Sequence, residues 1–200
     1  MYQQRCGTAL VTPHTEWTRG TCHHPSQHPI RQSTLRYMEG HCDACKETQG
    51  TTETRAIWGG YHDAGDWDRE GGHPDIPGVL ALAYVLTPQA FTDGELNIPE
   101  SGNGLPDLLD EARGGMDYYL RVQRPDGGVS VGLFMDSFPQ PGEGPAADTG
   151  EWFCYAPDPE AAYKVAASAC WVARALGKAG RADLGEPYVA SAWAHGLAVG

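Results

Sequence analysis

The distribution of apolar positions divides the chain near residue 75. Before that point apolar residues follow no regular period, and Thr, Gly, Pro, His and Cys are frequent. After it, apolar residues recur three and four positions apart, the spacing that places them on one face of an α-helix. No segment indicates parallel strands. We therefore expect one all-α domain, with long loops over residues 1–75 and helices over residues 76–200.

The first helix is predicted over residues 76–87, where Pro77 suits the first turn. Its predicted apolar face comprises Val79, Leu82, Ala83 and Leu86. The clearest helix is predicted over residues 105–123. Its predicted apolar face comprises Leu105, Leu108, Leu109, Ala112, Met116, Tyr119 and Leu120. Acidic residues begin this helix and Arg121 lies near its end, the order that the helix dipole favours.

A third helix is predicted over residues 159–177, with Asp158 as its N-cap and Pro159 at its first position. Its predicted stripe comprises Ala162, Val165, Ala166, Ala169, Ala173 and Leu176. A fourth helix is expected to begin near Pro187. The long segment 129–155 is expected to contain a short hairpin, and loops of this length are often functional. Its aromatic residues are candidates for lining a cleft or for packing: Phe134, Phe138, Trp152, Phe153 and Tyr155.

The charge of the chain narrows the range of partners. With 14 basic and 26 acidic residues the formal net charge is −12, which argues against a nucleic-acid partner. The excess of acid suits neutral or cationic substrates and calcium, and solubility alone accounts for it equally well. The chain has no run of 18 apolar residues, so no membrane partner is predicted. The segment MYQQRCGTAL lacks the apolar core of a signal peptide.

Residues 59–72, GGYHDAGDWDREGG, concentrate carboxylates and aromatic rings on a glycine-rich turn. Asp63 and Asp66 are spaced so that both carboxylates can point the same way. Hydrolysis of a glycosidic bond needs one carboxylate to polarise water, and a second can hold that water. Candidate aromatic platforms for a sugar ring are Trp58, Tyr61 and Trp67. From spacing alone, an acidic turn whose Asp side chains cap local amides is the simpler interpretation.

Several motifs in order resemble the catalytic domain of glycoside hydrolase family 9. They are YQQRCG (2–7), CHH (22–24), GGYHDAGDWD (59–68), the helix with its preceding loop (99–123) and PDPEAAYKVAASAC (157–170). The resemblance implies a six-hairpin (α/α)6 toroid, of which residues 1–200 form an incomplete N-terminal part. It also implies a secreted enzyme that acts on β-1,4-linked glucans, with its signal peptide absent from this sequence.

The same resemblance implies catalytic roles. Asp66 corresponds to the general base that takes a proton from the attacking water, and Asp63 to the residue that helps to hold this water. The family inverts anomeric configuration, and its acid is a distant glutamate with no match here, so we expect the fragment to be inactive alone. The continuation DWDRE departs from the commoner pattern. An exo-acting cellodextrinase or glucosaminidase, or a non-catalytic carbohydrate-binding module, therefore remains an alternative.

Cysteine and histidine residues predict a structural zinc site. Cys6, Cys22, His23 and His62 form a Cys₂His₂ set. The family resemblance supports the first three by position. The alternative is a Cys6–Cys22 disulfide. The pair Cys42 and Cys45 predicts a second half-site, a local disulfide or competing ligands for the first metal.

Oxygen ligands near residue 100 predict a calcium site. The candidate ligands are Glu100, Asn103, Asp107 and Asp110. Carboxylate and amide oxygens are the ligands that calcium prefers, and some members of the family bind calcium around this helix. The alternative is that these acids only complement the helix dipole. No organic cofactor is expected.

Overall fold

The computed structural model describes residues 2–26, 29–37, 50–63, 71–135, 140–148 and 150–198. Within these ranges lie four α-helices: α1 (Ile76–Leu86), α2 (Asp107–Val122), α3 (Pro159–Lys178) and α4 (Ala182–Ala198). Four short strands accompany them: β1 (Ile30–Ser33), β2 (Gly50–Arg55), β3 (Leu133–Met135) and β4 (Trp152–Cys154). Short 3₁₀ helices cover Tyr2–Gln4, His73–Asp75 and Pro88–Ala90. Among the helices described, none has the length and apolar composition that a membrane crossing needs.

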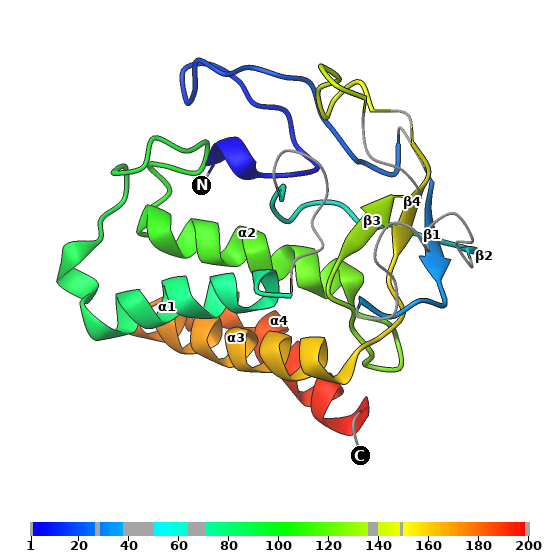
Figure 1. The fold of residues 1–200 in the computed structure, drawn as a ribbon. Coiled ribbons are helices and arrows are strands. Elements are labelled where there is room, and N and C mark those ends of the chain that lie inside the picture. The colour runs from blue at the N-terminus through cyan, green and yellow to red at the C-terminus, as the bar shows by residue number, and fades with distance from the viewer. Residues whose placement is uncertain are drawn as a thin grey trace.

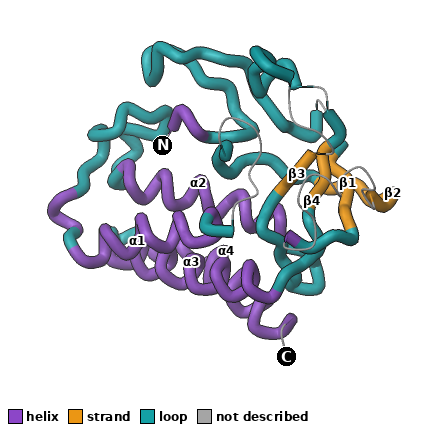
Figure 2. Tube along the Cα trace, viewed as in Figure 1, coloured by secondary structure: helices purple, strands orange, loops and turns teal. Residues whose placement is uncertain are grey.

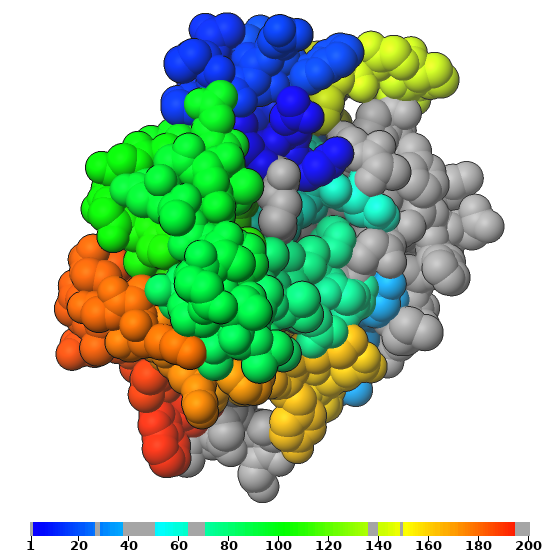
Figure 3. Space-filling view, turned by 90° about the vertical axis from the view of Figure 1, so that its left-hand side faces the viewer, coloured from blue at the N-terminus to red at the C-terminus, as the bar shows by residue number. Residues whose placement is uncertain are grey.

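Consecutive helices run in opposite directions, so that α1 and α3 lie side by side and parallel (Figure 1). α1 packs on α2 and α3, and α3 packs on α4. The N-terminal segment crosses the start of α2, and the two lie side by side in the space-filling view (Figure 3). The His14 ring lies 3.1 Å from the Asn97 carbonyl at this contact. The N-terminal loops are thus held against the segment that leads into α2.

The predicted helix over residues 105–123 is confirmed as α2, whose apolar face is largely buried. The face predicted for α1 is wrong, because Val79 is 62% exposed and Leu86 is 69% exposed. The buried residues are Pro77, Gly78, Ala81 and Tyr84. Almost every residue of α1 is apolar, so periodicity selects no face. Close packing decides instead, since a Cβ atom at Gly78 would lie 2.7 Å from the Ser168 hydroxyl of α3.

The beginning of α3 follows its sequence signals, whereas the beginning of α4 does not. Asp158 caps α3 by accepting a hydrogen bond of 3.1 Å from the Ala161 amide. α4 begins at Ala182, five residues before the predicted start, and contains Pro187 inside the helix. Its first turns are packed closely on α3, because a Cβ atom at Gly185 would lie 3.2 Å from the Ala173 Cα. Packing outweighs the hydrogen bond that proline removes.

A small four-stranded mixed sheet accompanies the four helices, so the all-α prediction is confirmed only in part. The strand order is β2-β1-β4-β3, with β1 and β4 parallel and the other pairs antiparallel. The antiparallel pairing of β3 with β4 confirms the short hairpin. The strands cluster beside one end of the helical layer (Figure 2). They have six residues or fewer, too few for a reliable alternating pattern, and β1 pairs with a strand about 120 residues away.

The sheet places the aromatic residues of segment 129–155 in the core. Leu133, Met135, Trp152 and Cys154 belong to the core that the helices share. The alternate residues Phe134 and Phe153 form a second cluster with Tyr155. The four aromatic side chains of this segment that the structure describes are buried, so they pack in the core and do not line a cleft. Phe138 lies outside the described residues. Cys154 is buried in the core, whereas Cys170 is exposed on α3.

Candidate metal centre and catalytic turn

The predicted zinc ligands come together from three segments. Cys6 follows the first 3₁₀ helix, Cys22 and His23 lie in the next loop, and His62 follows β2. All four side chains are buried, and their ligand atoms lie within 4.8 Å of one another. The sequence separates them by up to 56 residues, so this convergence is produced by the fold.

The geometry of this cluster fits a tetrahedral metal. The Cys6 Sγ atom lies 3.2 Å from His23 Nδ1, and the Cys22 Sγ atom lies 3.3 Å from His62 Nε2. Ligand atoms around tetrahedral zinc are about 3.4–3.8 Å apart, as zinc–sulfur and zinc–nitrogen bond lengths require. Cys6 and Cys22 are not joined by a disulfide, so the structure does not support that alternative. Cys42 and Cys45 lie outside the described residues.

Sequence reasoning missed two polar residues that contact this cluster, Asp148 and Arg19. His23 Nε2 lies 3.4 Å from Asp148 Oδ2, and both side chains are almost fully buried. A carboxylate on the far nitrogen of a histidine fixes which nitrogen is available to a metal, here Nδ1. The His23 ring also stacks on Trp152 of β4, with 3.9 Å between ring centroids. Asp148 lies 125 residues from His23 in a proline- and glycine-rich loop, and no local pattern identifies it.

Arg19 is the second residue that was missed. Its Nη1 atom donates to Cys22 Sγ at 2.8 Å, and its Nη2 atom donates to the Arg5 carbonyl. The hydrogen bond from Cys6 and the neighbouring His62 ring lower the pKa of the Cys22 thiol to about 3, against the effect of burial. The thiolate is the form that binds metals. The surroundings of Cys22 therefore suit a metal ligand.

The proposed catalytic turn begins directly after this cluster. Asp63 follows the candidate ligand His62 in the chain and is half-buried. Asp66 and Trp67 lie outside the described residues. The general-base role of Asp66 and the sugar contact of Trp67 stay predictions.

Two of the three aromatic residues predicted to contact a sugar are described, Trp58 and Tyr61, and both interact with other residues of the protein. The Arg121 guanidinium lies over the Trp58 ring at 4.5 Å from its centroid, and its Nε atom donates to the Trp58 carbonyl at 2.8 Å. Tyr61 is 7% exposed, and its hydroxyl donates to the carboxylate of Glu111 at 3.2 Å. A sugar contact by Tyr61 stays a prediction, while its burial favours a structural role.

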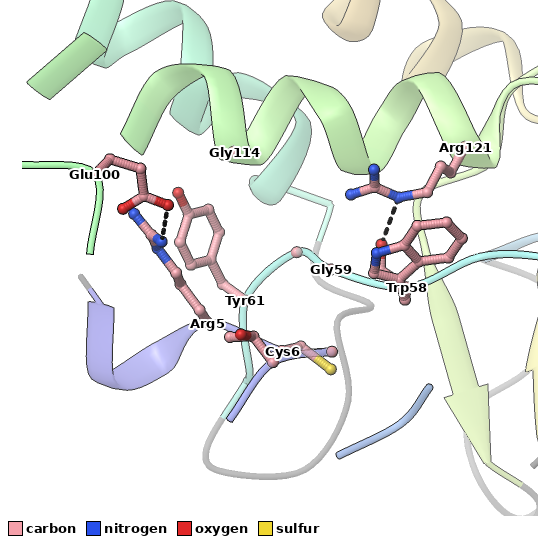
Figure 4. Close-up of a pocket in the computed structure, with 11 residues that line it drawn as sticks. Arg5, Cys6, Trp58, Gly59, Tyr61, Glu100, Gly114 and Arg121 are labelled. Carbon is pink, nitrogen blue, oxygen red and sulfur yellow. Dashed lines mark hydrogen bonds and ion pairs between the residues drawn. The ribbon is translucent and has the colours of Figure 1, made fainter. Parts of the chain in front are cut away.

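A cavity of about 240 Å³ lies beside these residues. Arg5 and Glu100 line one end of it, and Trp58 and Arg121 line the other (Figure 4). The Arg5 and Glu100 side chains pair with each other at 2.8 Å. The cavity thus combines paired charges with an aromatic ring already covered on one face.

The predicted calcium ligands are engaged by hydrogen-bond donors of the protein. Asp107 Oδ1 accepts from the Gly94 amide at 2.9 Å, and Oδ2 accepts from the Leu96 amide at 2.7 Å and the Ser101 hydroxyl at 2.8 Å. Although burial raises the pKa of Asp107, these hydrogen bonds hold it below its usual value. Asp107 is therefore the anchor of loop 94–101.

The other three predicted calcium ligands are also paired within the protein. Asp110 accepts from the Asn103 amide at 3.0 Å and from Arg113 at 3.2 Å, and Glu100 accepts from Arg5. Burial raises the pKa of Asp110, which disfavours its charged form. In the described part of the chain, the Cys/His cluster is the only group of residues arranged for a metal. The calcium prediction is not supported, because the structure satisfies these oxygen atoms with protein donors.

Comparison with known proteins places the chain in a family. The model of glycosyl hydrolase family 9 matches residues 1–192. Endoglucanase D of Acetivibrio thermocellus is 30% identical over 134 residues, which cover 66% of this chain and 19% of that protein. A xyloglucan-specific endo-β-1,4-glucanase of Bacteroides ovatus is 38% identical over 89 residues, or 41% of this chain and 15% of that protein.

Solved structures agree with this result. A metagenome-derived glycoside hydrolase family 9 endoglucanase superposes with a TM-score of 0.76 and 31% identity, covering 99% of this chain and 34% of that one. A zinc-binding triple mutant of a family 9 endoglucanase superposes with a TM-score of 0.72 and 26% identity, covering 97% and 35%. The chain spans about a fifth of its curated relatives' length and about a third of these structures. It belongs to glycosyl hydrolase family 9.

Proposed function

We propose that this chain provides the general-base half of an inverting glycosidase that cleaves β-1,4-linked glucans. The family membership and the position of Asp63, directly after a buried candidate metal ligand, support this proposal. Asp66 acts as the general base, and Asp63 helps to hold the attacking water. The catalytic acid is a glutamate outside these residues. Because such polymers are too large to enter a cell, the enzyme acts extracellularly.

The chemistry follows from the separation of the two catalytic groups. An inverting enzyme places its acid and base roughly 6.5–9.5 Å apart, so that a water molecule fits between the base and the sugar. Asp66 takes a proton from this water as it attacks the anomeric carbon. Asp63 orients the water by accepting its other proton in a hydrogen bond. Both roles require the turn to be held rigidly.

The Cys/His cluster supplies rigidity to this turn in the proposal. Cys6, Cys22, His23 and His62 would hold a zinc ion with four protein ligands. A closed set of four ligands leaves no open position for substrate, so zinc bound there has a structural role. The four helices likewise form the first part of an (α/α)6 toroid, which the alternating direction of consecutive helices and the parallel packing of α1 on α3 support.

Replacement of Asp66 by asparagine tests the proposal. In the complete polypeptide, Asp66→Asn is expected to remove nearly all release of reducing ends from cello-oligosaccharides, because an amide cannot accept the proton from water. Asp68→Asn makes the same chemical change in the same turn and serves as the matched control. Activity near that of the unmodified enzyme in Asp66→Asn would rule out the base assignment.

Exo-acting hydrolysis is the second candidate function. Relatives of this chain include a cellulose 1,4-β-cellobiosidase of Acetivibrio thermocellus, 26% identical over 140 residues, and a cellodextrinase of Butyrivibrio fibrisolvens, 32% identical over 81 residues. A single short product from the earliest times would favour the exo mode, and a ladder of products would favour the endo mode. Release from chito-oligosaccharides would indicate a glucosaminidase. Binding without any release would favour a carbohydrate-binding module.

A further inference from the structure

Residues 4–6 and 60–62 form a short antiparallel pair that joins the N-terminal segment to the catalytic turn. The His62 amide donates to the Gln4 carbonyl at 2.8 Å, and the Cys6 amide donates to the Gly60 carbonyl at 2.9 Å. Arg5 lies directly opposite Tyr61. The two segments approach closely, since a Cβ atom at Gly7 would lie 2.5 Å from the Gly59 nitrogen.

Alternation along this pair separates two groups of side chains. In extended segments successive side chains point to opposite faces. Cys6 and His62 therefore share the face that belongs to the candidate metal cluster. Arg5 and Tyr61 share the other face, which meets α2 (Figure 4). Asp63 immediately follows the pair, so whatever fixes the pair also fixes the start of the catalytic turn.

Glu111 of α2 receives both side chains of the second face. Its Oε2 atom accepts from Arg5 Nε at 3.3 Å, and its Oε1 atom lies 3.1 Å from Arg5 Nη2. The Tyr61 hydroxyl shares its proton between Oε2 at 3.2 Å and the Glu111 carbonyl at 3.1 Å. Glu111 is fully buried. A buried carboxylate of this kind is stable only while its partners are in place. We call Arg5, Tyr61 and Glu111 the α2 clamp.

The surface of α2 is shaped to accept the Tyr61 ring. Gly115 lies one turn after Glu111, on the same helix face. A Cβ atom at Gly115 would lie 3.5 Å from the Tyr61 ring and 2.8 Å from Pro77 of α1. Pro77 therefore excludes a side chain at this position, and the Tyr61 ring lies within van der Waals reach of the same helix surface. Hydrogen bonding and packing fix Tyr61 together.

We infer that Glu111 is a positioning residue, which through Arg5 and Tyr61 fixes the backbone that leads into Asp63. The inference rests on the proposed function of Asp63 and Asp66. The candidate metal cluster fixes one face of the pair, and the α2 clamp fixes the other. Glu111 itself contacts no reacting group, so its effect is on the geometry of the turn.

The test uses single replacements in the complete polypeptide. Glu111→Gln keeps the size of the side chain but presents an amide to the Arg5 guanidinium. The value of kcat is expected to fall between about 10- and 100-fold, because small displacements of a catalytic group have effects of this size. KM is expected to change less than about threefold. Tyr61→Phe removes one hydrogen bond and is expected to lower kcat about three- to tenfold.

A matched control exists on the same helix. The Tyr188 hydroxyl of α4 donates to Asp117 of α2 at 2.7 Å, so Tyr188→Phe removes the same atom from the same kind of pair. Only Tyr61→Phe is expected to lower kcat. In the double variant Glu111→Gln/Tyr61→Phe the losses are expected to be less than additive, since both act through one contact. Equal losses in Tyr61→Phe and Tyr188→Phe would overturn the inference.

Hydrogen exchange provides a measurement that does not depend on activity. In Glu111→Gln, amide exchange is expected to accelerate in peptides that contain Cys6 and His62, and to stay unchanged in α3. Unchanged exchange at the pair, or faster exchange with unchanged kcat, would overturn the positioning role. Failure of the proposed function is distinguished by Asp66→Asn: if that variant remains active, the exchange result alone decides whether Glu111 positions this segment.

Discussion

The chain contains two clusters of potential metal ligands, and the structure treats them in opposite ways. In the Cys/His cluster, the four ligand atoms converge from three segments to within 4.8 Å. In the acidic cluster around Asp107, the carboxylate oxygens accept hydrogen bonds from loop amides, a hydroxyl and arginines. Both clusters contain suitable residue types. Only the first presents them to one another.

The difference shows that nearby hydrogen-bond donors decide whether the ligand atoms of such residues face one another or are engaged by the protein. Asp107 serves as the acceptor for a loop that lacks regular structure, so its lone pairs are used by the backbone. A cation would have to displace these donors and leave buried amides unsatisfied. Around Cys22 the arginine and the second thiol instead favour the thiolate. The sequence shows ligand types but not the donors that compete for them.

The largest effect is expected from removal of a ligand in the Cys/His cluster. Cys22→Ser in the complete polypeptide should abolish stoichiometric zinc binding, because a hydroxyl is a far weaker ligand than a thiolate. Zinc content per chain and the unfolding midpoint with and without a chelator measure the effect. Cys170→Ser, which alters an exposed cysteine on α3, is the control. A chain that holds no zinc before substitution would contradict the prediction.

A smaller effect is expected from the carboxylate behind His23. Asp148→Asn should weaken zinc affinity about 10- to 100-fold, because the amide no longer stabilises the protonated Nε2 atom and the ring loses its fixed orientation. Competition with a chelator of known affinity measures the change. Asp126→Asn, which replaces an exposed carboxylate in a turn, should leave the affinity unchanged. Equal zinc affinities for the unmodified protein, Asp148→Asn and Asp126→Asn would show that the Asp148 carboxylate does not orient His23.

Local signals in the sequence predicted what depends on local structure. The bounds of α2 and the Asp158 cap of α3 are set by spacing and capping within a few residues. The resemblance of motifs in order identified the family. It also indicated three of the four candidate zinc ligands, while His62 was added from its residue type and the bound zinc stays a prediction. These successes rest on residues whose roles are fixed by their neighbours in the chain or by a long motif.

Long-range contacts account for what the sequence did not predict. The exposed face of α1 depends on how closely Gly78 meets Ser168, and the early start of α4 depends on Gly185 against Ala173. The sheet joins β1 to β4 across most of the chain. Asp148 contacts His23 from a distant loop, and Asp107 is saturated by amides of a segment without periodicity. Each of these features depends on packing or hydrogen bonds between segments that are far apart in the sequence. No local pattern shows that such segments lie close together in the fold.

The smallest effect is expected from a substitution in the acidic cluster around Asp107. Asp107→Asn should lower the free energy of unfolding by about 1–2 kcal/mol near pH 7, because an amide cannot accept all three hydrogen bonds. The pKa of Asp107 is depressed in the folded state, so its contribution is fully present above the unfolded value of about 3.9 and is lost as pH falls through the folded value. The difference between the two proteins should therefore shrink in acid.

Denaturant unfolding at pH 7 and near pH 3, with Asp183→Asn as an exposed control, measures this difference. The Asp183 carboxylate pairs with Arg181 at the surface, where such pairs contribute little. Addition of calcium should leave the unfolding midpoint of both Asp107 forms unchanged, because the protein donors already occupy these oxygens. A midpoint that calcium raises in the unmodified protein but not in Asp107→Asn would make the two clusters alike, and the donors around Asp107 would then be displaceable by a cation.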